Sequence, residues 1–523
     1  MKTMNCFIRI FLSVILLFGI TELATAQEKT TVVPKPNLLN QRVSISVEEE
    51  NLSKVIEKLC KELNLDYSFN AKLFEGKKVS INLINRPLKE VFEKLMKDYY
   101  LLFEIENNIL VVRDYIPIKE NLFYDKSGNF IFPNSGFYLD NQKIRKMSIR
   151  FKTASNLIII PVQINNSDTL NFILDTGVQY PIITELPYIN KLNLNYLRAY
   201  ELQGWGLDEP ITAYRSAGNL ISIPGLTAKN QDIQLIINEE FQVSQILGMP
   251  VHGLIGFCSF KNFVVEIDYL NERLTLIRPD LFKYKKRKND IELPLEIIES
   301  RPYIKSTVMI DESTEVPVRL LLDTGASDAL WIISESDKRL KMPATTMHTF
   351  LGKGLSGELY GNRGRYKAIK IDNKILKEPI IAFPDSLYSI YILKDSDRNG
   401  TLGSEILRRF NVTIDYPNSR IILHPNKNID EEFNCNMSGM EVLNPMPGFP
   451  IYIVSNIREG SPAYLAGIRK DDQIITINGR THRDISLNDI NLLLQSRENK
   501  KIKIAVLRNG EKMETTFILK KEF

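Results

Sequence analysis

Several residue types are scarce in this chain of 523 residues, and each scarcity excludes a class of protein. The 4 cysteines are too few and too widely spaced for a disulfide framework. The 4 histidines show neither the spacing of a metal site nor a GxSxG partner. Lys and Arg together number 67 against 63 Asp and Glu, so no excess of positive charge points to nucleic acid. We therefore expect no metal, no cofactor and no nucleic-acid partner.

Long apolar runs are also missing, apart from one short stretch near the N-terminus. Lys2 and Arg9 precede the apolar residues 10–20, and a small-x-small pattern follows at residues 24–26. The apolar stretch is too short for a bilayer core of about 30 Å, so a retained anchor is the weaker alternative. We expect residues 1–26 to be a cleaved signal peptide and the protein to be secreted.

What remains is ordinary globular composition, with 44% hydrophobic and 25% charged residues. At about 150 residues per domain, the length predicts three to four domains. The densest basic run lies within residues 283–291, and we interpret it as a solvated linker. The chain is expected to be multidomain.

The first pattern after the leader alternates strands with helices over residues 42–114. Alternating apolar residues predict strands at 43–47 and 79–83, each followed by residues with helical spacing, 52–63 and 88–96. Residues 102–112 predict a hairpin that turns at Asn107 and Asn108.

This repeated strand-helix order resembles the secretin and TonB short N-terminal (STN) domain, on the strings NLSKVIEKLC and GKKVSINLINRPLKEVFEKLM. The resemblance implies a Gram-negative envelope location, periplasmic or at the outer membrane. It also implies an envelope protein partner for the STN domain. A small α/β domain of unrelated origin is the alternative. Residues 115–148 lack sustained periodicity, and we interpret them as a linker.

An internal repeat occupies the middle of the chain. Three motifs recur with spacings of 147 or 148 residues: Asp175-Thr176-Gly177 with Asp323-Thr324-Gly325, residues 253–256 with 400–403, and residues 268–273 with 415–420. Two tripeptide copies in one register are not a coincidence. We expect residues 149–282 (lobe 1) and 292–427 (lobe 2) to be two copies of one β-rich unit.

Paired aspartates at the ends of apolar strands predict a specific chemistry. Two carboxylates brought face to face cannot both ionise cheaply, so they share one proton. The ionised member can take a proton from water while the protonated member donates one to a carbonyl oxygen. Asp175 and Asp323 are therefore the candidate catalytic residues, and Gly177 and Gly325 would let backbone approach them closely.

The repeated apolar-Asp-Thr-Gly strands resemble the aspartic peptidases of the pepsin and retropepsin type. The resemblance implies that Thr176 and Thr324 lock the two catalytic loops together. Pepsin-type enzymes have Ser or Thr after the glycine, where this chain has Val178 and Ala326. Because neither side chain can donate a hydrogen bond to a carboxylate, we expect activity to extend to weakly acidic or near-neutral pH.

Glycine-rich segments in both lobes are candidates for hairpin flaps. Gly354 belongs to a GxGxxG string that lacks the following helix of a phosphate site, so a flap is the better interpretation. Trp205 and Gly206 are its candidate counterparts in lobe 1.

The string SPAYLAGIRKDDQIITINGR, at residues 461–480, closely resembles bacterial PDZ domains. One departure is Asp471, where the family usually has glycine. We expect a PDZ domain over residues 430–523. PDZ domains bind C-terminal peptides by strand addition, and Ser438, Gly439 and Met440 are the candidate carboxylate-binding residues.

The expected fold is thus a small α/β STN domain, a mainly-β double-lobed acid-protease fold built from two retropepsin-like lobes, and a C-terminal PDZ β-sandwich with helices. The expected function is an aspartic-type endopeptidase of the cell envelope that hydrolyses peptides or proteins. The alternative is a catalytically inactive envelope protein that binds or senses peptides through its STN and PDZ domains.

Overall fold

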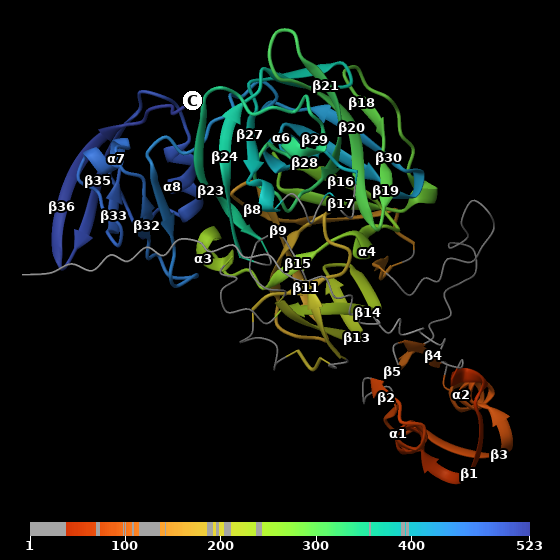
Figure 1. Cartoon of the computed structure of the whole chain (residues 1–523). Coiled ribbons are helices and arrows are strands. Elements are labelled where there is room, and N and C mark those ends of the chain that lie inside the picture. Colours follow the sequence, from red (N-terminus) through yellow and green to blue (C-terminus); the bar gives the residue numbers. More distant parts are fainter. Residues whose placement is uncertain are drawn as a thin grey trace, which may run out of the picture.

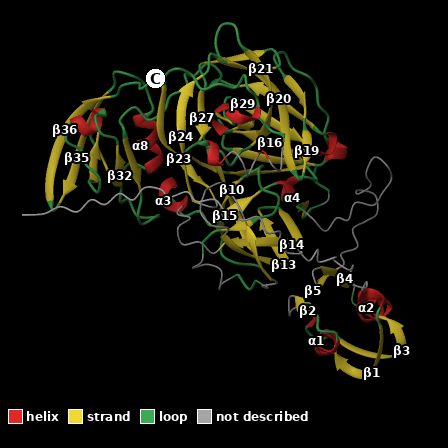
Figure 2. Ribbon diagram, in the orientation of Figure 1, coloured by secondary structure: helices red, strands yellow, loops and turns green. Residues whose placement is uncertain are grey.

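The computed structural model describes residues 38–523 apart from 69–73, 98, 100, 107–108, 115–135, 142, 186–191, 195–197, 203–210, 237–242, 355–356, 389–392 and 394–396. The described chain is multidomain and mostly β, with few and short helices (Figure 2). The expected signal peptide lies outside the described residues.

The N-terminal unit is a small α/β arrangement with its own sheets and its own core (Figure 1). Its strands form a two-stranded sheet, β1-β3, and a three-stranded sheet, β2-β5-β4, and the expected hairpin is the antiparallel β4-β5 pair. Two amphipathic helices bury their apolar faces in one core that includes the free thiol of Cys60. The elements are β1 (Arg42–Asn51), α1 (Leu52–Glu62), β2 (Asp66–Ser68), β3 (Lys78–Pro87), α2 (Leu88–Lys97), β4 (Leu101–Glu106) and β5 (Ile109–Asp114).

Lobe 1 is built on a nine-stranded sheet in the order β12-β13-β14-β11-β15-β10-β9-β8, with β6 paired to β14. Strand β10 pairs in parallel with β15, and β11 pairs antiparallel with β15 on its other side. The elements are β6 (Tyr138–Leu139), β8 (Lys152–Ala154), β9 (Leu157–Ile164), β10 (Leu170–Leu174), β11 (Ile182–Ile183), β12 (Arg198–Leu202), β13 (Ile211–Ile223), β14 (Leu226–Ile236), α3 (Val243–Leu247), β15 (Gly253–Ile255) and α4 (Phe257–Phe260).

Lobe 2 repeats this arrangement in a ten-stranded sheet, β23-β24-β27-β22-β28-β21-β20-β25-β26, with β19 paired to β20. Strand β21 pairs in parallel with β28, and β22 pairs antiparallel with β28, as β10, β11 and β15 do in lobe 1. The elements are β19 (Glu296–Ile298), β20 (Arg301–Met309), β21 (Glu315–Leu322), β22 (Leu330–Ile332), β23 (Thr346–Gly354), β24 (Gly357–Arg365), β25 (Ala368–Ile371), β26 (Lys374–Lys377), β27 (Ile380–Pro384), β28 (Gly400–Leu402) and α6 (Ser404–Leu407).

A six-stranded sheet, β18-β30-β29-β16-β17-β7, joins the two lobes. At its centre β16 and β29 pair antiparallel, and Glu266 faces Thr413, its own counterpart in the repeat. The sheet therefore has an approximate twofold axis, and one hydrophobic core runs through both lobes. Its strands are β7 (Lys146–Arg150), β16 (Val264–Asp268), β17 (Arg273–Ile277), β18 (Ile291–Pro294), β29 (Phe410–Asp415) and β30 (Arg420–Pro425).

The C-terminal unit is a six-stranded sheet in the order β31-β32-β33-β35-β36, with β34 paired to β33. Helix α8 begins with a capping box, in which Ser486 and Asp489 each satisfy a backbone amide of the other. Asp471 has a φ of +70°, which glycine adopts without strain, so the left-handed backbone explains the usual family preference at this position. The elements are β31 (Met440–Leu443), β32 (Ile453–Ile457), α7 (Pro462–Leu465), β33 (Gln473–Ile477), β34 (Arg480–Thr481), α8 (Leu487–Leu494), β35 (Lys501–Arg508) and β36 (Glu511–Ile518).

The structure corrects the expected linker boundary at residue 148. Phe137 is buried against Phe260, with ring centroids 5.5 Å apart, and its N–H donates to the Ser259 carbonyl at 2.8 Å. Strand β6 pairs with β14 and β7 with β17, so residues 136–148 belong to the body of lobe 1. The expected linker residues 115–135 lie outside the described part of the chain.

Among the residues that the structure describes, every helix is too short or too polar to cross a bilayer.

The burial of Phe137 gives a test of this boundary. Phe137→Ala should lower the free energy of unfolding of the two-lobed body by about 3 to 5 kcal/mol, because it removes a buried ring and leaves a cavity. Phe449→Ala is the control, since this ring is 61% exposed. Denaturant unfolding measures both. Equal stabilities would show that residues 136–148 are not part of the body.

Candidate active site

The repeat places Asp175 and Asp323 at equivalent positions, directly after β10 and β21. The N–H of Asp175 donates to the Ile255 carbonyl at 2.9 Å, and the N–H of Asp323 donates to the Leu402 carbonyl at 3.0 Å. Each aspartate is thus fixed to the strand that lies parallel to its own. Asp175 is buried and Asp323 is half-buried. The two carboxyl groups converge beside Gly177, since a Cβ on this glycine would lie 3.1 Å from Asp175 Oδ1 and 3.2 Å from Asp323 Oδ2.

Thr176 and Thr324 join the two loops that carry the candidate aspartates by reciprocal hydrogen bonds. The hydroxyl of Thr176 donates to the Leu322 carbonyl at 2.5 Å, and that of Thr324 donates to the Leu174 carbonyl at 2.7 Å. Each hydroxyl also accepts from the backbone N–H of the other threonine at 3.1 Å. Both side chains are buried, so these bonds are shielded from competing water. The arrangement brings the four predicted residues Asp175, Thr176, Asp323 and Thr324 into one cluster.

Gly177 and Gly325 are needed for this close approach. Their N–H groups donate to the Oδ1 atoms of Asp175 and Asp323 respectively, each at 2.8 Å. A Cβ on Gly325 would lie 2.3 Å from Cγ of Asp175, and one on Gly177 would lie 3.1 Å from Asp175 Oδ1. A side chain at Gly325 would therefore displace the partner carboxylate.

The pKa values of both aspartates are raised. Burial is the largest cause for each, and for Asp175 the charge of Asp323 adds to it. The Gly325 amide and the charge of the buried Arg398 guanidinium act in the opposite direction on Asp323, because they favour its ionised form. The pair can therefore hold one proton, and the charge of Arg398 favours Asp323 as the ionised member.

Backbone amides also act on the two carboxyl groups at the positions that follow the glycines. The N–H groups of Val178 and Ala326 lower the pKa values of Asp175 and Asp323 respectively. The N–H of Val178 itself donates to the backbone carbonyl of Asp175, at 3.3 Å.

Of the predicted flap residues, only one lies in the described part of the chain. Gly354 ends β23 and pairs with Gly357 at the start of β24, so the expected hairpin is present in lobe 2. Trp205 and Gly206 lie outside the described residues.

Sequence reasoning missed a side-chain cluster beside the catalytic loop of lobe 2. The guanidinium of Arg363 donates to both carboxylate oxygens of Asp328, at 3.0 and 3.2 Å, and the indole Nε1 of Trp331 donates to Asp328 at 3.0 Å. Asp328 follows the DTGAS string closely, and that adjacency is the signal that could have found it.

The candidate carboxylate-binding loop of the PDZ domain is largely buried, and some of its amides are used in hydrogen bonds within the loop. Ser438 and Met440 are buried. The N–H of Ser438 donates to Asn436 Oδ1 at 2.9 Å, and that of Met440 donates to Ser438 Oγ at 3.1 Å. Gly439 has a φ of +76° and is half-buried. Binding of a peptide carboxylate by Ser438, Gly439 and Met440 stays a prediction.

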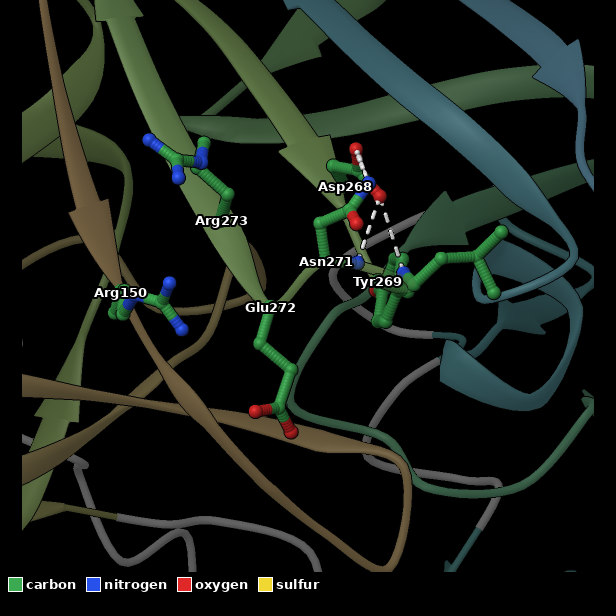
Figure 3. Close-up of a pocket in the computed structure, with 7 residues that line it drawn as sticks. Arg150, Asp268, Tyr269, Asn271, Glu272 and Arg273 are labelled. Atoms are coloured by element: carbon green, nitrogen blue, oxygen red, sulfur yellow. Dashed lines mark hydrogen bonds between the residues drawn. The ribbon is translucent and has the colours of Figure 1, made fainter.

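A cavity of about 510 Å³ lies on the sheet that joins the lobes (Figure 3). It is lined by Arg150 and residues 268–273, at the β16-β17 turn. Asp268 accepts hydrogen bonds from the N–H groups of Leu270 and Asn271 there, each at 3.1 Å. The repeated Asp268 and Asp415 thus cap equivalent turns, since Asp415 accepts from Asn418 at 3.3 Å. The capping of these turns explains why the aspartate recurs in both lobes.

Within the described ranges, no three His, Cys, Asp or Glu side chains converge as a metal site.

The family comparison identifies the C-terminal unit. Residues 453–508 match the model of the PDZ domain, so the chain carries a PDZ domain at its C-terminus. A stretch of 84 residues is 33% identical to the carboxy-terminal processing protease CtpA of Bacillus subtilis (strain 168). That stretch is 16% of this chain and 18% of CtpA, so the chain spans less than a fifth of that relative.

The threonine bonds can be tested by removing one hydroxyl. Thr324→Val should lower the free energy of unfolding by about 2 to 4 kcal/mol, because it deprives the Thr176 N–H of its acceptor and the Leu174 carbonyl of its donor. Thr324→Ser keeps the hydroxyl and should retain most of the stability. If denaturant unfolding shows the valine variant to be as stable as the serine variant, the hydroxyl does not join the loops.

The shared proton makes stability depend on pH. Because the pKa of Asp175 is raised above the ordinary 3.8, the folded protein holds this proton more tightly than the unfolded chain. The stabilisation by the protonated Asp175 is fully present at pH values below the ordinary pKa of 3.8. It is lost as the pH rises from there through the raised pKa of the folded protein. Asp175→Asn should therefore unfold at a higher temperature than wild type at neutral pH.

Thermal unfolding between about pH 3 and about pH 8 measures this difference, which should shrink toward the acid end. Asp168→Asn, at an exposed carboxyl, is the control. A constant difference between Asp175→Asn and wild type would contradict the raised pKa.

Proposed function

We propose that the chain is an aspartic-type endopeptidase with a double-lobed acid-protease fold. The observation that carries the proposal is the convergence of Asp175 and Asp323, whose loops are held by reciprocal threonine bonds at the junction of two repeats. The partial similarity to a protease supports peptidase activity in general, whereas the aspartic mechanism rests on the geometry of the pair.

In the proposed mechanism, Asp323 is the ionised member and Asp175 the protonated one, as the charge of Arg398 favours. Asp323 takes a proton from a water molecule, which attacks the peptide carbonyl carbon. Asp175 donates its proton to the carbonyl oxygen, giving a neutral tetrahedral intermediate. The intermediate collapses as the C–N bond breaks. Asp323 gives the proton that it took from water to the leaving nitrogen, and Asp175 takes a proton from one hydroxyl of the intermediate, which becomes the new carboxyl group. Asp175 is then protonated and Asp323 ionised, as at the start.

The other domains would supply location and recruitment. The STN resemblance and the N-terminal apolar stretch support an envelope location, periplasmic or at the outer membrane, with an envelope protein partner for the N-terminal unit. The PDZ domain would recruit peptides or proteins by strand addition. Neither role needs a metal or a cofactor.

The experiment is cleavage of a diverse peptide library by the purified chain and by two single variants, Asp175→Asn and Asp323→Asn. Each variant should lose turnover by a factor of about 10³ or more, because each removes either the base or the acid. Asp168→Asn should cleave as wild type does. Product analysis by mass spectrometry measures all four proteins.

Two outcomes would contradict the proposal. Retention of substantial activity by Asp175→Asn, with loss in Asp323→Asn, would exclude a paired-carboxylate mechanism. Binding of peptides without cleavage by the wild-type chain would favour the alternative, an envelope peptide-binding protein.

A further inference from the structure

The hairpin β23-β24 of lobe 2 has little intrinsic rigidity. Its strands pair from Thr346 and Gly364 at the base to Gly354 and Gly357 at the tip, with a register shift between Phe350 and Gly352. Glycines recur along both strands, and glycine weakens a strand because it loses the most conformational freedom on folding. A hairpin of this composition needs an external support to stand in one position.

Arg363 provides such a support. Its guanidinium forms the two-pronged bond to Asp328 and also donates to the Leu351 carbonyl of β23 at 3.3 Å. The side chains of Arg363 and Asp328 are each only 19% exposed. A charge-assisted, bidentate pair that is largely withdrawn from water is both strong and specific in geometry.

Asp328 belongs to the rigid frame of the catalytic loop. It lies between Asp323 and β22, and its carbonyl accepts from the N–H of Glu405 at 3.4 Å. A Cβ on Gly403 would lie 2.2 Å from the same carbonyl oxygen, so backbone packs tightly against it. The Arg363–Asp328 pair therefore connects the hairpin to the loop that carries Asp323.

The base of the hairpin is held a second time, by the C-terminal region. The guanidinium of Arg365 donates to the carbonyls of Phe433 and Phe523, at 3.0 and 3.2 Å. In lobe 1, Tyr180 occupies the repeat position of Asp328, and Arg215 pairs with Asp232 of the neighbouring strand β14.

We propose that Arg363 is a positioning residue, which acts through Asp328 to hold the β23-β24 hairpin at a fixed position relative to the dyad. The inference rests on the proposed function, because it takes the dyad as the reacting centre. A hairpin held in this way contributes to substrate binding only while the pair is intact. Loss of the pair should therefore raise KM more than it lowers kcat.

The test compares Arg363→Gln, Asp328→Asn and the double variant, all in the full chain. Each single variant should raise KM for a cleaved peptide about tenfold, and the double variant should be no worse than either, because both remove the same bond. Arg363→Lys keeps the charge without the fork and should fall between wild type and Arg363→Gln. Arg339→Gln is the matched control, since Arg339 makes the same fork to Asp337 but is 56% exposed.

Hydrogen exchange provides a readout that does not depend on turnover. Amides of β23 and β24 should exchange faster in Arg363→Gln and Asp328→Asn, while those of the loop 323–327 stay protected. Faster exchange in both regions would mean general unfolding and would overturn the proposal. So would additive effects in the double variant, or unchanged KM and exchange in Arg363→Gln.

If the wild-type chain cleaves no peptide, the hydrogen-exchange measurement alone tests the role of Arg363. Faster exchange confined to the hairpin would support the role of Arg363 although the peptidase proposal had failed.

Discussion

The reciprocal hydrogen bonds of Thr176 and Thr324 are the contacts on which the candidate site depends. Two ionised carboxyl groups repel each other and lose hydration when they leave water, so nothing in their own chemistry would bring Asp175 and Asp323 together. The threonines lie one residue further along each loop and hold the loops in contact through four hydrogen bonds. The two threonines are neutral, and their hydrogen bonds hold the carboxyl groups in a placement that the carboxyl groups themselves disfavour.

The repeat explains why these contacts can be symmetric. Strands β16 and β29 pair about a twofold axis through Glu266 and Thr413, so each lobe presents the same loop to the other. The symmetry is broken by charged residues of lobe 2. Arg398 favours ionisation of Asp323, and Arg363 binds Asp328, where lobe 1 has Tyr180. Two nearly equal carboxyl groups can thus take different roles in one reaction.

Much of this arrangement follows from the sequence, because it depends on local pattern. The spacing of apolar residues predicted the strand-helix order of the N-terminal unit, and the repeat predicted the pairing of the Asp-Thr-Gly motifs. The PDZ domain was predicted from its string and is confirmed by the family match. The STN and acid-protease assignments stay predictions.

The remainder depends on contacts between distant residues. Strand β6 has two residues, too few to show a period, so residues 136–148 looked like linker although Phe137 is buried. The Arg363–Asp328 pair joins positions 35 residues apart. The sequence around one residue does not predict a contact with the other. The internal bonds of Ser438 and Met440 depend on Asn436 and on the local turn, which a motif comparison does not describe.

The central claim is that the pair holds one proton at a pH where ordinary carboxyl groups have lost theirs. A difference titration of the folded wild-type chain against Asp175→Asn/Asp323→Asn measures this directly, without a substrate. At pH values just above the range in which ordinary carboxyl groups titrate, wild type should carry more bound protons than the double variant, because the pair retains a proton there. Equal numbers of bound protons in the two proteins at those pH values would show that both carboxyl groups ionise independently and would contradict the account.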